Sequence, residues 1–244
     1  MQVLIHENAL AMGRDTATRA ADILSQAIAL HGEARLIVAT GASQFSVLDQ
    51  LTADVSVDWS CVDGFHLDEY VGLDDQHPAS FCRYLWERFV SRVPLRSFTF
   101  LRGTAEPCKL LTEVGEKLTE KPIDLALVGI GENGHLAFND PPADFETDSP
   151  YLIVKLDEAC RQQQVGEGWF ASLSEVPTEA FSMSIRQIMK STAILCSVPD
   201  ARKATAVQNT LEGDISPAIP ASILREHPNV VINLDRQSAS LLAK

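Results

Sequence analysis

The sequence lacks several features that would assign a protein to a class at once. None of its five cysteines forms a Cys-x-x-Cys pair, and their odd number and wide spacing predict reduced thiols in a cytoplasmic protein. No apolar run approaches the ~18 residues that a membrane span needs, and the first residues are typical of a short strand rather than a signal peptide. We therefore expect no membrane association and a cytoplasmic location.

Basic residues are also scarce: 20 Lys and Arg stand against 33 Asp and Glu, which gives a net charge of −13. Binding to nucleic acid depends on clustered basic side chains, so we expect no nucleic-acid partner. The charge does not exclude a phosphorylated small molecule, because backbone N–H groups at a helix start and one or two basic side chains suffice to bind a phosphate. The composition leaves open whether the protein is a monomer or a homo-oligomer.

What is present is a regular alternation of strand-like and helix-like segments along all 244 residues. It predicts a single α/β domain over residues 1–244, Rossmann-like and three-layered, with a mainly parallel sheet and helices on both faces. Strands are expected at 3–6, 35–39, 60–67, 97–101, 123–128, 192–197 and 230–234. Helices are expected at 9–30, 44–51, 78–91, 108–118, 181–190 and 201–212. The weakly patterned stretch 143–177 predicts a long functional loop, such as a lid.

The most informative segment begins with the apolar run Ile123–Val128, which predicts a strand buried on both faces. Glycines, a histidine and a carboxylate follow it, at the strand end where α/β sheets bind ligands. Gly129, Gly131 and Gly134 also spell the G-x-G-x-x-G of dinucleotide sites. That fingerprint requires a helix directly after the glycines, and Pro141-Pro142 exclude a long one. We therefore expect no dinucleotide cofactor.

Three other expected strand ends carry polar groups. One leads into a helix and offers hydroxyls and N–H groups to a phosphate: Thr40, Gly41, Ala42 and Ser43. The second carries His66 and Asp68, but no third metal ligand stands at a recognisable spacing, so we expect no metal site. At the third, Arg202 or Lys203 could bind an anion.

Because the carboxyl ends of parallel strands share one edge of a sheet, these groups are expected to converge. Together they indicate an acid–base site for a sugar phosphate. Each group also has a plainer interpretation. Asp68 could be a solvated turn carboxylate, His135 could hydrogen-bond its own turn, and Lys203 could lie on the surface.

Four strings resemble, in the right order, the glucosamine-6-phosphate deaminase (isomerase) family: Phe65–Leu73 (Phe-His-Leu-Asp-Glu-Tyr-Val-Gly-Leu), His77–Ser80, Gly129–Pro141 and Lys203 with Glu212-Gly213. The resemblance covers essentially the whole chain. The related 6-phosphogluconolactonases share the fold, but a Thr-Ala-Ser-Leu type of sequence follows their glycine–histidine motif. Here Leu136-Ala-Phe-Asn139 follows it, which favours the deaminases.

The resemblance implies conversion of glucosamine 6-phosphate and water to fructose 6-phosphate and ammonia in amino-sugar metabolism, without metal or cofactor. It implies that His135 opens the sugar ring with Asn133 and Asp140, and that Asp68 moves a proton from C2 to C1 through an enolamine. It also implies a set of phosphate-binding residues: Thr40, Gly41, Ala42, Ser43, Gly134 and Lys203.

The chain departs from the family pattern in several places. Asn133 replaces an aspartate, and Asp140 replaces a glutamate that is one methylene longer. We therefore expect Asp140 to reach His135 by a backbone shift or through water. Gln44 alters the phosphate loop, and Arg161 gives no clean match to the family's phosphate-binding arginine. Two alternatives stay open: a lactonase-type hydrolase on the same fold, and a sugar-phosphate-binding protein without catalysis.

Overall fold

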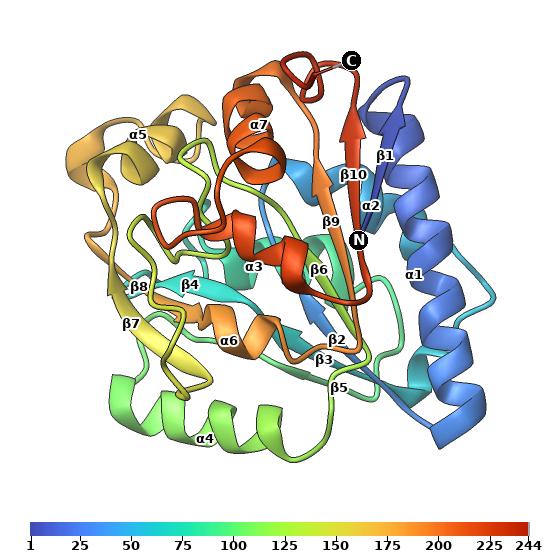
Figure 1. Cartoon of the computed structure of the whole chain (residues 1–244). Helices are drawn as coiled ribbons and strands as arrows, with labels where there is room; N and C mark the ends of the chain where they lie inside the picture. Colours follow the sequence, from blue (N-terminus) through green and yellow to red (C-terminus); the bar gives the residue numbers. More distant parts are fainter. Residues whose placement is uncertain (244) are drawn as a thin grey trace.

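The computed structural model describes residues 1–243 and is built around a seven-stranded parallel sheet (Figure 1). The strand order is β1-β10-β9-β6-β2-β3-β5. The strands are β1 (Gln2–His6), β2 (Ala34–Val38), β3 (Val62–His66), β5 (Ser97–Thr99), β6 (Leu125–Val128), β9 (Ala193–Val198) and β10 (Val230–Asp235). Each corresponds to an expected strand, and the expected α/β architecture with a mainly parallel sheet is confirmed.

Strand β6 is buried on both faces, as its continuous apolar sequence predicts. Leu125 and Leu127 belong to the core on one face, and Ala126 and Val128 to the core on the other. Successive side chains of a strand point to opposite faces, so only an unbroken apolar run can fill both cores.

Helices cover the two faces of this sheet. On one side lie α1 (Ala9–His31), α2 (Phe45–Leu51) and α3 (Phe81–Leu85). The other core takes up side chains of α4 (Pro107–Thr119), α6 (Ile185–Ile188) and α7 (Ala204–Glu212). Figure 1 shows α1 running along the sheet beside β1 and β10, and α4 at the bottom of the molecule. Among the helices of residues 1–243, none is both long and apolar enough to cross a membrane.

A second, antiparallel sheet of three strands was not expected. It has the order β4 (Asp68–Tyr70), β8 (Glu179–Met183) and β7 (Tyr151–Lys155). The helix predicted over 181–190 is therefore wrong in its first part, where β8 pairs with a strand on each side. Only the short α6 is helical, and its N–H at Gln187 is capped by the hydroxyl of Ser184.

The stretch 143–177, here called the lid segment, is more ordered than its weak pattern predicted. It contains β7 and helix α5 (Glu158–Gly166), which begins where Asp157 accepts the N–H of Cys160. The hydroxyl of Tyr70 donates to Oε1 of Gln164 at 2.8 Å, so α5 is tied to β4. Figure 1 shows α5 at the upper left, on the same side of the molecule as β7.

Two other expected helices differ at their ends. The helix predicted over 78–91 begins at Phe81, after its cap Ser80, and continues as a π-helix from Trp86. The helix predicted over 201–212 begins with a 3₁₀ turn and becomes α-helical at Ala204. Both changes occur at helix ends, which sequence patterns define least well.

Candidate active site

A pocket of about 330 Å³ lies where β2, β6 and β9 end, and it is also bordered by β4 and α5. Most of the predicted site residues line it: Thr40, Gly41, Ala42, Ser43, Asp68, His135 and Lys203. The strands of the large sheet are parallel, so their carboxyl ends meet at one edge and bring together residues far apart in the sequence.

His135 reaches this pocket from a hydrogen-bonded group behind it. Its Nδ1 lies 3.1 Å from Oδ1 of Asp140, and both side chains are largely buried. Asn133 joins the two: its Oδ1 accepts the N–H of His135 at 3.0 Å, and its Nδ2 donates to Asp140 at 3.0 Å. Asn133 and Asp140 do not line the pocket but hold the histidine that does. The shorter Asp140 makes this contact directly, so no bridging water is needed.

The charges of this group favour a proton-transferring imidazole. Burial by itself would raise the pKa of Asp140, but hydrogen bonds from His135, Asn133 and the backbone N–H of Asp157 bring it below its usual value. Asp140 is therefore ionised beside the ring. Within residues 1–243, Nε2 of His135 has no hydrogen-bond partner, which leaves this nitrogen available to a ligand.

Two glycines after β6 leave room for neighbouring side chains of the site. A Cβ atom on Gly131 would lie 2.2 Å from Nε2 of His135, and one on Gly129 would lie 2.7 Å from Oγ of Ser43. Gly134 has a φ of 85° and forms the turn before His135, while its N–H donates to the carbonyl of Gly131. Gly134 does not line the pocket, so the structure gives no support to its predicted phosphate contact.

Asp68 is a buried carboxyl group that lines the pocket. It is only 6% exposed, and its Oδ1 has no hydrogen-bond partner among residues 1–243. Burial, with a smaller effect of the neighbouring charge of Glu69, raises its pKa to about 8. Glu69 itself is bonded by Ser80 and by the N–H groups of Tyr70 and Cys82. Asp68 is therefore the carboxyl free to exchange a proton with a ligand.

The two candidate metal groups are engaged in other contacts. His66 does not line the pocket, and its Nδ1 accepts the N–H of Leu101, so it does not pair with Asp68. Within residues 1–243, donor atoms of His135, Asp140 and Cys160 do come within 4.8 Å of one another. Two of these atoms, Nδ1 of His135 and Oδ1 of Asp140, are paired with each other at 3.1 Å.

The two basic candidates after β9 differ in their surroundings. Both line the pocket, but the guanidinium of Arg202 is paired with Asp200 at 3.0 Å and its side chain is 44% exposed. The side chain of Lys203 is only 9% exposed, and its Nζ lies 3.5 Å from Oε1 of Glu167. Lys203 is therefore the better placed of the two to meet an anion inside the pocket.

The loop after β2 is held against the end of β6. Gly41 has a φ of 86°, and its carbonyl accepts the hydroxyl of Tyr84 at 3.0 Å. Nε2 of Gln44 donates to the carbonyl of Val128 at 3.1 Å and to Oγ of Ser43 at 3.2 Å. Gln44, which departs from the family pattern, thus fixes the loop in place.

The sequence did not single out the pocket residues that come from the lid segment. Gln163, Gln164 and Glu167 line the pocket from α5 and its C-terminal end. Arg161 does not, because its guanidinium donates to the carbonyls of Leu173 and Val176 within the same segment. The sequence signals for this contribution were the weak pattern of 143–177 and the glutamine run Gln162–Gln164 within it.

Comparison with known proteins places the chain in a family. A model of the family described as glucosamine-6-phosphate isomerases/6-phosphogluconolactonase matches residues 7–232. The chain belongs to this family. Among its relatives, a glucosamine-6-phosphate deaminase from Oenococcus oeni is 36% identical over 208 residues, 85% of this chain and 86% of the relative. One from Streptococcus pneumoniae is 33% identical over 245 residues, with both chains fully covered.

Solved structures agree with this family assignment. A monomeric glucosamine-6-phosphate deaminase superposes with a TM-score of 0.90 at 29% identity, covering 99% of this chain and all of the other. A 6-phosphogluconolactonase from Shewanella baltica has a TM-score of 0.74 at 20% identity, covering 96% of this chain and 97% of the other. At that low identity the second comparison shows a shared fold only.

Proposed function

We propose that this family member converts glucosamine 6-phosphate and water to fructose 6-phosphate and ammonia. The observation that carries the proposal is one pocket lined both by a partnerless carboxyl, Asp68, and by a histidine paired with a carboxylate. The reaction needs two separate proton transfers, and these are two separate proton-transferring groups. The named activity of the relatives that are 33% and 36% identical supports the same choice.

Ring opening is the step we assign to His135. Its free Nε2 takes the proton of the C1 hydroxyl and delivers it to the ring oxygen as the bond between C1 and that oxygen breaks. Asp140, ionised and 3.1 Å from Nδ1, stabilises the imidazolium that forms in between. Asn133 positions both groups through its side-chain amide.

Isomerisation is the step we assign to Asp68. It takes the proton from C2 of the open-chain aldehyde, and the C1 oxygen is protonated, which gives an enolamine. Return of the proton to C1 gives an iminium at C2, and addition of water there releases ammonia and leaves the ketone. A pKa of about 8 suits both directions of transfer. The ammonium of the substrate would lower that pKa and so supply the charged base.

The phosphate subsite we propose combines the loop Thr40–Ser43 with Lys203, and the lid segment closes the same pocket through α5.

We also propose that the whole chain is one domain acting in the cytoplasmic breakdown of amino sugars, including N-acetylglucosamine. Five free cysteines support a reducing compartment.

An ammonia-coupled assay on the purified protein tests the proposal. With glucosamine 6-phosphate we expect ammonia and fructose 6-phosphate in equal amounts, and with unphosphorylated glucosamine much slower turnover. Hydrolysis of 6-phosphogluconolactone without ammonia release from the amino sugar would instead identify a lactonase. Binding of glucosamine 6-phosphate with no turnover of either compound would identify a non-catalytic binding protein.

A further inference from the structure

Glu167 is an acidic residue inside a pocket that we expect to bind an anion. It follows α5 directly, and its carboxylate lies 3.5 Å from Nζ of Lys203. The side chains of Glu167 and Lys203 are only 8% and 9% exposed. A carboxylate beside a phosphate-binding lysine would repel the phosphate, so its presence needs a physical reason.

The carboxylate is held by its own segment rather than by the lysine. Oε1 of Glu167 accepts Nε2 of Gln163 at 2.8 Å, and Oε2 accepts Nε1 of Trp169 at 3.2 Å. Gln163 in turn accepts the N–H of Glu132 at 2.9 Å, which connects the group to the loop after β6. The indole of Trp169 packs edge-on against the ring of Phe45. Glu167 is therefore a fixed charge.

The negative charge of Glu167 favours the protonated form of Lys203, and it leaves N–H donors of the ammonium unused. Burial lowers the pKa of Lys203, and the carboxylates of Glu167 and Glu132 oppose that effect, while Arg202 adds to it. The distance of 3.5 Å between Nζ and Oε1 exceeds the 2.7–2.9 Å typical of a charge-assisted hydrogen bond. An ammonium has three N–H donors, so Lys203 keeps donors for a second anion.

We propose that Glu167 is a positioning residue of the phosphate subsite. Its fixed carboxylate holds the ammonium of Lys203 charged and inside the pocket, where the ammonium binds the phosphate of the substrate. The identity of the ligand rests on the proposed function.

The test is a double-mutant cycle with Glu167→Gln and Lys203→Ala. Glu167→Gln keeps the shape of the side chain and removes its charge, so KM for glucosamine 6-phosphate should rise roughly 10-fold with kcat much less affected. The dissociation constant for inorganic phosphate, measured by calorimetry, should rise with it. In the Lys203→Ala background, Glu167→Gln should cause no further rise and should lower both quantities slightly, because it then only removes a charge that repels the phosphate.

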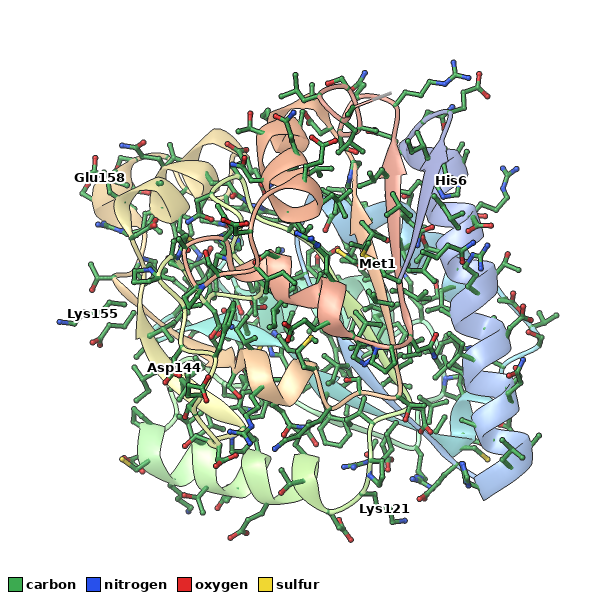
Figure 2. All side chains as sticks on the ribbon, viewed as in Figure 1. Met1, His6, Lys121, Asp144, Lys155 and Glu158 are labelled. Carbon is green, nitrogen blue, oxygen red and sulfur yellow. The ribbon has the colours of Figure 1, made fainter. Side chains whose placement is uncertain are left out.

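Glu158→Gln is the matched control. Glu158 is an exposed carboxylate at the start of the same helix, bonded only to Gln162 and seen at the outer edge of the molecule in Figure 2. It should leave KM and phosphate binding unchanged. If Glu167→Gln does not fold, Trp169→Phe, which removes one donor to the carboxylate, should give a smaller rise in the same direction.

An unchanged or lower KM in Glu167→Gln would overturn the inference. So would an equal loss of phosphate affinity on Glu167→Gln in the unmodified protein and in the Lys203→Ala variant. Inorganic phosphate separates this inference from the proposed function. A protein that releases no ammonia, yet shows the coupling of Glu167 and Lys203 in phosphate binding, would contradict the proposed function alone. Absence of phosphate binding by the unmodified protein would overturn the inference.

Discussion

At the scale of single residues, Asp68 makes the native protein sensitive to pH. Its native pKa of about 8 lies well above the usual 3.8, so the folded chain binds this proton more tightly than the unfolded chain does. The contribution of Asp68 to the free energy of unfolding is thus highest below pH 4. It falls as the pH rises to about 8 and then levels off.

The variant Asp68→Asn cannot ionise and should escape this loss. Its melting temperature relative to the unmodified protein should therefore increase between about pH 4 and pH 8, and the two should be similar at the acidic end. Thermal denaturation followed across this range measures the difference. A difference that stays constant with pH would mean that the Asp68 carboxyl ionises as it does in the unfolded chain.

Asp140 should matter most for ring opening. Asp140→Asn keeps the shape of the side chain but cannot stabilise the imidazolium of His135, so turnover of the closed-ring amino sugar should fall roughly 10²–10³-fold. Exchange of solvent deuterium into C1 of fructose 6-phosphate, in the presence of ammonia, should fall much less because it starts from the open chain. Equal losses of rate in the two assays would mean that Asp140 has no dedicated role in ring opening.

At the scale of elements, the turn after β6 works only because Gly131 lacks a side chain. A Cβ there would lie within 2.4 Å of three atoms of the His135 ring, so Gly131→Ala should displace the imidazole and lower kcat by roughly 10²-fold or more. Gly166→Ala is the control, since a Cβ there would meet nothing within 4 Å. Comparing kcat and melting temperature in both variants tests this. Normal turnover by Gly131→Ala would contradict the geometry.

The strands of the parallel sheet were predictable because the residue pattern within each segment is enough to indicate a strand. An apolar run as short as Leu125–Val128 is too short for a buried helix and indicates a strand buried on both faces. β8 was mistaken for a helix because its conformation depends on β4 and β7, which lie far away in the sequence and pair with it on both sides. No local pattern carries that information.

The same distinction applies to the site. Asp68, His135 and Lys203 were predictable as neighbours because strand ends of a parallel sheet converge. Gly134 does not line the pocket, since the backbone direction of a turn decides which glycine approaches a ligand. Glu167 could not be found because its role depends on where α5 packs, which no spacing in the sequence indicates.

At the scale of the whole molecule, the proposed chemistry needs no metal ion. The proton transfers use only His135, Asp140 and Asp68, so no step requires a metal-bound water or a Lewis acid. Dialysis against EDTA, with metal content checked, should therefore leave ammonia release intact. Activity that disappeared on chelation and returned with a divalent ion would require a different mechanism.

The most direct test of the account is the turnover of Asp68→Asn on glucosamine 6-phosphate. Asparagine keeps the shape of the side chain and removes its ability to accept the C2 proton. We expect kcat to fall roughly 10²–10⁴-fold, while the affinity for the substrate stays within a few fold. Near-normal turnover by this variant would contradict the assignment of Asp68, and with it the chemistry proposed for the pocket.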